Sequence, residues 1–410
     1  MCLPATLLDG LFEQPAGKPS SPKETLVKLV LPQFVAIDSS TLASWAKDAF
    51  AIDSKLQASA RDVQTSLLSA NWIPIICLQH FIELARHSDL EVAAKRVDFL
   101  KSFSHIAWLG RSYGSNILGA IVDIFEAEIA AIVGSPNIDF ADIRGSVRGK
   151  LVQCGSPTDI GVLNDWEYLR PTLMAMAIRE QEITSILHTE RTVNDDVEIA
   201  QLGNIQIEDP THFERLLLDE IAKTTENLTG RGDPRLTDPN HTAREFISTV
   251  ASNLVEVANR GGTAADALAE QHDVPRIDIS DTTTLRQFKQ LARMRRLARV
   301  AVKQLGLDLD QIWPKLRDAK IPSEVIQETI RKARETAPRA SGSDLGDDYL
   351  ACLAPYVDAI IVDKRTHEFM TQGARRDPYF REMVGFFEKT ASYKQLPEIL
   401  ARHPGGGQPK

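Results

Sequence analysis

Short runs of consecutive apolar residues alternate with amphipathic helices in the first part of this chain. The runs Phe34–Ile37, Ile73–Cys77 and His105–Leu109 are bounded by polar or turn residues, which is typical of buried strands. Between and after them, apolar positions at helical spacing predict helices over 41–49, 54–69, 79–87 and 90–103. Continuous apolar strands that alternate with helices indicate a parallel α/β sheet.

The pattern changes after about residue 115. Strand signals fade, and amphipathic helices separated by caps and by Pro or Gly breaks dominate the chain to about residue 338. The helices expected there are 115–133, 161–188, 211–227, 241–259, 281–305 and 322–336. A last apolar run, Val357–Val362, restores the strand signal before further helices. We therefore expect one α/β domain that is interrupted by a large all-α insertion and receives its last strand from the C-terminal side.

This pattern divides the chain into five parts. Residues 1–23 mix Pro, Gly, Ser and Lys without periodicity, so they are expected to form a flexible arm, and residues 403–410 a flexible tail. The α/β domain is expected at 24–115 and 341–402. The helical insertion then occupies 116–340.

Composition indicates a folded protein of a reducing compartment. The chain has 410 residues, 43% hydrophobic and 25% charged, with a formal net charge of -9. This charge argues against wholesale binding of polyanions but allows local basic patches. No apolar run approaches the roughly 20 residues that span a bilayer, and the N-terminal residues lack a secretion signal. The four cysteines form no CxxC and no zinc spacing, which fits a reducing cytoplasm. We therefore expect a cytoplasmic protein that is not bound to a membrane.

Acidic residues stand where the predicted strands end. Asp38 follows the first strand, Glu83 lies on the helix that leaves the second strand, and Asp363 ends the last strand. Asp347 or Asp348 begins the helix that leads into that last strand. Since sites in open α/β sheets form outside the carboxyl ends of the strands, these carboxylates are expected to meet at one edge.

Such a group of carboxylates suits Mg²⁺ or Mn²⁺, which prefer hard oxygen ligands. Two such ions could activate a water molecule and stabilise the leaving oxygen during phosphodiester hydrolysis. Asp358 is excluded from the group, because five strand residues at roughly 3.3 Å each separate it from Asp363 by roughly 16 Å. Each remaining acid also has a structural interpretation, as a helix cap, a solvated helix residue or the start of a loop.

The order of these acids resembles that of the PIN-like nuclease superfamily. The resemblance is carried by Phe-Val-Ala-Ile-Asp38-Ser-Ser, by His-Phe-Ile-Glu83-Leu-Ala-Arg-His and by Val-Asp-Ala-Ile-Ile-Val-Asp363-Lys-Arg-Thr. Asp347 or Asp348 corresponds to the aspartate that opens a late helix in that family. The similar segments cover less than half of the chain, and most small members of the family lack an insertion of this size.

The resemblance implies a PIN-like fold and a metal-dependent endonuclease that acts on RNA more often than on DNA. It implies that Asp38, Glu83, Asp347 or Asp348, and Asp363 are the catalytic residues and the ligands of Mg²⁺ or Mn²⁺. Small bacterial members of the family often serve as toxins or in defence against phage, so the resemblance extends to such a role. The insertion would then select the substrate, bind an inhibitory or activating protein partner, or block the site.

The predicted helix at Leu285–Lys303 is strongly basic and contains no acidic residue. In an otherwise acidic protein it could line a groove for the phosphate backbone of RNA. The alternative is a solvated face, or a partner for acidic helices of the same domain. The residues proposed to contact nucleic acid are Arg293, Arg295, Arg296, Arg299 and Lys303.

Two other functions remain open from the sequence. The core could be a nuclease-like fold without activity that binds nucleic acid or serves as a scaffold. The segment that begins at Asp38 also resembles haloacid-dehalogenase-type phosphatases, but Ser40 stands where that family carries its second aspartate. Whether the chain forms a homo-oligomer is equally open.

Overall fold

A mixed, seven-stranded sheet forms the centre of the fold, and branched and aromatic residues dominate its central strands. The structure is a computed structural model that describes residues 31–111, 114–135, 138–189, 195–202, 210–231, 236–259, 263–335 and 344–404. The strands are β1 (Gln33–Ile37), β2 (Trp72–Ile76), β3 (Ile106–Arg111), β4 (Gly114–Leu118), β5 (Val152–Gly155), β6 (Ala359–Val362) and β7 (Phe386–Lys389). The order across the sheet is β4-β3-β2-β1-β6-β7, and β5 also pairs with β3.

The sheet is mixed, whereas the sequence pattern predicts a parallel one. β1 pairs in parallel with β2 and β6, β2 with β3, and β6 with β7, so the predicted parallel core is present. β4 and β5 run antiparallel to β3. β4 begins so soon after β3 that no crossover fits between them, which leaves only an antiparallel pairing. The insertion expected at 116–340 is therefore not wholly helical.

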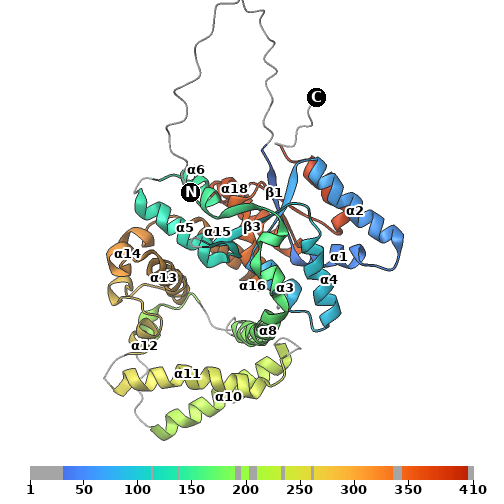
Figure 1. Cartoon of the computed structure of the whole chain (residues 1–410). Helices are drawn as coiled ribbons and strands as arrows, with labels where there is room; N and C mark the ends of the chain where they lie inside the picture. The colour runs from blue at the N-terminus through green and yellow to red at the C-terminus, as the bar shows by residue number, and fades with distance from the viewer. Residues whose placement is uncertain are drawn as a thin grey trace, which may run out of the picture. The chain divides into compact units, whose positions relative to one another are not determined.

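Side chains of the central strands alternate between two faces of the sheet. In β1, Phe34 and Ala36 join one apolar cluster, and Val35 and Ile37 join another. This alternation explains the continuous apolar run, because a strand covered on both faces has no polar side. The Val35 face is covered chiefly by α1 (Ser39–Ala49), α2 (Ser54–Ser69), α3 (Leu78–Ala85), α4 (Leu90–Lys101) and α19 (Leu396–Ala401) (Figure 1).

The opposite face is covered largely by helices from the segment expected to be an insertion. These are α5 (Ile121–Gly134), α6 (Phe140–Leu151), α13 (Leu285–Leu305), α14 (Leu309–Arg317) and α15 (Pro322–Glu335). They are joined there by α16 (Asp344–Ala351), α17 (Lys364–Arg376) and α18 (Pro378–Val384). Part of the inserted segment is thus core of the α/β fold, since it buries the Phe34 face of the sheet.

The remaining helices of that segment pack chiefly on one another. α8 (Trp166–Thr189), α10 (Pro210–Arg231) and α11 (Pro239–Asn259) form one packed group, and α10 and α11 run side by side (Figure 1). α9 (Ile199–Leu202) and α12 (Ala264–Gln271) share a small apolar cluster with α13. α7 (Gly161–Asn164) is a single turn.

Two further expectations concern the ends of the chain and the membrane. The arm predicted at 1–23 lies outside the described residues, as does the predicted tail from residue 405 onward. Within the described ranges, no helix has both the length and the apolar character needed to cross a bilayer.

Candidate functional site

The order of the sheet reverses at β1. β2 and β3 lie on one side of β1, and β6 and β7 lie on the other. The connection that follows β1 therefore leads to one side of the sheet, and the connection that follows β6 leads to the other side. Asp38 directly follows β1, and its N–H donates to the carbonyl of Ile361 on β6 at 2.8 Å. Asp363 directly follows β6. Both aspartates therefore lie at the crevice outside the carboxyl ends of the strands, where open α/β sheets bind their ligands.

Both aspartates also begin helices, and each uses one oxygen to do so. Asp38 Oδ2 accepts hydrogen bonds from the N–H groups of Ser40 and Thr41 at 3.1 and 3.3 Å, and from the Ser40 hydroxyl. Asp363 Oδ1 accepts from the N–H of Thr366 at 2.6 Å. The other oxygen of each carboxylate receives no hydrogen bond from the described residues. The structural interpretation as helix caps and the interpretation as site residues are therefore compatible.

Glu83 on α3 and Asp347 on α16 complete the group of acids that the structure brings together. Glu83 Oε1 accepts a hydrogen bond from Gln79 Nε2 at 2.8 Å, one turn earlier on α3. Among the described residues, none donates a hydrogen bond to the Asp347 carboxylate. A pocket with a volume of about 10 Å³, about that of one water molecule, opens between these helices. It is lined by Asp38, Ser39, Gln79, His80, Glu83, Gly346, Asp347 and Leu350.

The charges of the four acids act on one another. Burial raises the pKa of Asp347 to about 8, and the charges of neighbouring acids add to the effect, namely those of Asp363, Asp38, Glu83 and Asp348. Burial also raises the pKa of Asp38, and the charges of Glu83 and Asp363 contribute. Like-charged groups shift one another in this way only at close range. The members of the acidic cluster formed by Asp38, Glu83, Asp347 and Asp363 therefore lie close enough together to disfavour one another's ionisation.

His80 fixes the start of α3 against the end of β1. Its Nε2 lies 3.0 Å from the carbonyl oxygen of Ile37, and the N–H of Cys77 donates to Nδ1 at 3.1 Å. Because a backbone N–H can only donate, Nδ1 must keep its lone pair and Nε2 must carry the proton. Buried His80 thus ties together the two elements that carry Asp38 and Glu83.

Sequence reasoning did not single out Gln79 or Gly346 as members of the site. The spacing of Gln79 and Glu83, four positions apart on one helix, is a signal that could have indicated their contact. Gly346 carries no comparable signal, because its importance depends on how α16 lies against α3.

Two acids of the C-terminal segment lie outside the acidic cluster. The Asp348 carboxylate is held by the Arg334 guanidinium through two hydrogen bonds of 2.9 and 2.5 Å, so Asp347 is the member of the pair that faces the cluster. Asp358 binds Arg148 through two hydrogen bonds of 2.9 Å and accepts from the N–H of Phe34 at 2.8 Å. Asp358 therefore lies outside the cluster, as the distance argument predicts, and its contacts fix the entry of β6.

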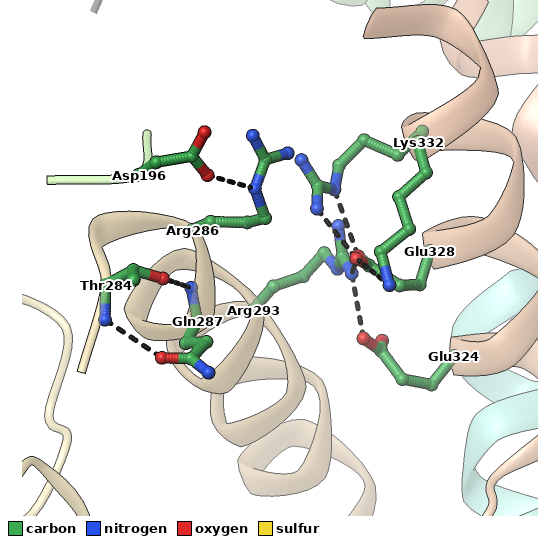
Figure 2. A network of polar contacts seen from close by, with 9 residues as sticks. Asp196, Thr284, Arg286, Gln287, Arg293, Glu324, Glu328 and Lys332 are labelled. Atoms are coloured by element: carbon green, nitrogen blue, oxygen red, sulfur yellow. Dashed lines mark hydrogen bonds and ion pairs between the residues drawn. The ribbon is translucent and has the colours of Figure 1, made fainter. Parts of the chain in front are cut away.

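The first two arginines of the predicted nucleic-acid patch face carboxylates of the same fold. Arg293 binds Glu324 at 2.8 Å and Glu328 at 3.1 Å, and Figure 2 shows these groups joining α13 to α15. Arg295, whose side chain is 4% exposed, binds Asp310 at 2.6 Å. These two residues therefore follow the alternative weighed from the sequence, as partners for acidic side chains. Ion pairs within the fold hold both guanidinium groups, which makes them poor candidates for binding phosphate.

The other three members of the patch are exposed. Arg299 forms an ion pair with Asp273. Arg296 and Lys303 make no ion pair with any residue that the structure describes. The basic surface of α13 that remains is therefore much smaller than the sequence pattern indicates.

The donor set of the acidic cluster fits a hard cation, because it consists of carboxyl oxygens. Across the described ranges, however, no three His, Cys, Asp or Glu side chains are arranged around one point as metal ligands would be. The cluster thus has suitable donors without a formed coordination shell. Compared with known proteins, the chain matches no family model, no curated protein and no solved structure.

Proposed function

We propose that this protein is a metal-dependent nuclease whose active site is the acidic cluster. The observation that carries the proposal is the gathering of Asp38, Glu83 and Asp347 around one pocket, where burial and neighbouring carboxylates raise the pKa of Asp347 to about 8. A fold that gathers buried like charges at a sheet crevice loses stability unless a ligand of opposite charge compensates. Perturbed carboxylates in such a position are characteristic of functional sites.

Mg²⁺ or Mn²⁺ is the cation that we propose for this site, held by Asp38, Glu83, Asp347 and Asp363. Such an ion supplies Lewis acidity, and it makes water a nucleophile at neutral pH. The protein contributes the placement of the carboxylate oxygens around the ion. The hydrogen bonds to Asp38 and Asp363 fix one oxygen of each carboxylate, and they leave the second oxygen for the ion. Gln79 holds Glu83 in the same way.

A phosphatase of the haloacid-dehalogenase type is less well supported. Its nucleophilic aspartate would be Asp38, but Ser40 stands where that family carries its second aspartate. Of the two alternatives, the inactive scaffold is the one that a specific observation favours, namely the lack of a formed coordination shell among the described residues.

The proposed substrate is a nucleic acid, and the preference for RNA over DNA rests on the resemblance to PIN-like nucleases. Arg296 and Lys303 are the members of the basic helix that support phosphate binding, since both are exposed and neither forms an ion pair with the described residues. A toxin or phage-defence role, and regulation by a protein partner, belong to the same proposal and rest on the same resemblance.

The test compares Asp38→Asn and Asp363→Asn with wild type and with Asp53→Asn. Asp53 is a matched control, because it caps α2 through the N–H of Lys55 at 2.8 Å and lies away from the cluster. Asparagine caps helices about as well as aspartate, so all three variants should fold. Cleavage of single-stranded RNA and DNA is measured with Mn²⁺, with Mg²⁺ and with EDTA, and Mn²⁺ binding is measured by calorimetry.

Wild type and Asp53→Asn should cleave in a metal-dependent way. The two site variants should lose about 100-fold or more, since even residues around a metal's ligands typically contribute 10–100-fold. Equal cleavage by wild type and both site variants would refute the nuclease proposal. Absence of cleavage and of any Mn²⁺ binding that depends on Asp38 would establish the scaffold instead.

A further inference from the structure

Gly346 lies directly against the carboxylate of Glu83. α16 contacts α3, and Gly346 is a buried residue in the first turn of α16. A methyl group built at Gly346 would overlap Glu83 Oε1, and it would lie 3.3 Å from Glu83 Cδ and 3.1 Å from Gln79 Nε2. The hydrogen-bonded pair of Gln79 and Glu83 therefore fills the space that any other residue at 346 would need.

The backbone of Gly346 gives no other reason for a glycine. Among the described residues, only Gly306 and Gly385 are glycines with positive φ, so Gly346 does not need the conformational freedom of glycine. Inside a helix, glycine is destabilising relative to alanine. Gly145 in α6 is a useful contrast, because a methyl group built there meets no atom within 4 Å. What distinguishes Gly346 is the close approach of a carboxylate.

We propose that Gly346 is a positioning residue of the acidic cluster, whose missing side chain lets the Glu83 carboxylate lie beside Asp347. This inference rests on the proposed function, because positioning matters only if the cluster binds a cation. Gln79 and the bare backbone of Gly346 hold Glu83 from two sides. The neighbouring residue, Asp347, carries the carboxylate that Glu83 must approach.

The contact predicts which part of the structure would move in a Gly346→Ala variant. The atom that the new methyl group meets first is the end of a flexible side chain, not backbone. A rotation of Glu83 therefore relieves the overlap, and the packing of α3 and α16 can remain as it is. The variant should fold at least as well as wild type, since alanine favours the helix, and yet it should lose the arrangement of the site.

The experiment compares wild type, Gly346→Ala, Gly145→Ala, Glu83→Ala and the double variant Gly346→Ala/Glu83→Ala. Thermal unfolding should give Gly346→Ala and Gly145→Ala a Tm equal to or above that of wild type. Mn²⁺ affinity and cleavage should fall about 10–100-fold in Gly346→Ala and remain unchanged in Gly145→Ala. The double variant should be no worse than Glu83→Ala alone, because two changes that act through one group are not additive.

A crystal structure of metal-free Gly346→Ala provides a readout that is independent of activity. A displaced Glu83 carboxylate between unmoved α3 and α16 backbones supports the positioning role. Unchanged Mn²⁺ affinity, or additive losses in the double variant, would overturn it. If wild-type protein neither binds Mn²⁺ nor cleaves, the proposed function fails, whereas an unmoved Glu83 in the variant structure refutes the steric argument by itself.

Discussion

Replacing Asp347 with asparagine should stabilise the metal-free protein, and the gain should grow as the pH rises. The pKa of Asp347 is about 8 in the folded protein, against an ordinary value of 3.8. Below pH 4 the carboxyl is protonated in both the folded and the unfolded state, so it has no effect on stability. Between pH 4 and pH 8 the unfolded chain releases this proton while the folded protein retains it, and the free energy of unfolding therefore falls with pH.

The size of the effect follows from the same shift. One pKa unit corresponds to about 1.4 kcal/mol, so the three units between pH 4 and pH 7 give an upper bound of about 4 kcal/mol. Because the site opens to solvent, which screens the repulsion, we expect about 2–4 kcal/mol. Asparagine cannot ionise and has nearly the shape of aspartate, so the Asp347→Asn variant should lose this dependence on pH.

Urea unfolding in EDTA, repeated from pH 4 to pH 8, measures the effect. The stability difference between Asp347→Asn and wild type should rise from near zero at pH 4 to 2–4 kcal/mol at pH 7. Asp281→Asn is the control, because Asp281 is exposed and outside the cluster. Mn²⁺ should stabilise wild type more than the variant. A stability difference that stays flat across this pH range would refute the raised pKa of Asp347 on which the prediction rests.

Two further predictions concern buried groups outside the cluster. Arg334→Met should destabilise the fold by about 3–5 kcal/mol, because it removes the guanidinium that holds the largely buried Asp348 carboxylate. Adding Asp348→Leu should recover most of that loss in urea unfolding, and additive losses would contradict this. Glu128 accepts hydrogen bonds from Ser323 and Tyr356, and burial raises its pKa to about 7. Because the unfolded chain releases this proton at lower pH than the folded protein, wild type should lose up to about 3 kcal/mol of stability as the pH rises from 4.5 to 7. Glu128→Gln should flatten that slope, and parallel pH profiles for the two proteins would show the reasoning to be wrong.

The central sheet could be predicted from the sequence because its strands are covered on both faces. A strand without a polar face is a continuous apolar run, and β1, β2, β3 and β6 were all found in this way. β5 escaped prediction because its residues are half-buried or exposed, and only pairing with β3 makes them a strand. The sequence pattern also misses β4, since most of its residues fall within the helix predicted at 115–133.

The acidic cluster could be anticipated from the positions of Asp38, Glu83 and Asp363 relative to the strands. The choice between Asp347 and Asp348 could not be made from the sequence. It depends on Arg334, which lies on a different helix and binds Asp348.

The basic helix was misleading for the same kind of reason. A run of arginines without acids looks unpaired in the sequence, but the carboxylates that neutralise Arg293 come from α15, some 30 positions later. Which charges on different helices lie close together depends on how the helices pack, and the pattern of residues along the sequence does not show that packing.

The position of β1 between β2 and β6 has a consequence for the synthesis of this protein. The contact that joins β1 to the entry of β6, between Phe34 and Asp358, spans 324 positions of the chain. At roughly 5–20 residues per second, a ribosome needs about 15–60 s to pass from one strand to the other. During that interval one edge of β1 has no partner, and unpaired strand edges promote aggregation. The acidic cluster is also incomplete until the ribosome has passed Asp363. The nascent chain therefore carries an open sheet edge for most of its synthesis, and it cannot assemble the proposed nuclease site before β6 has emerged.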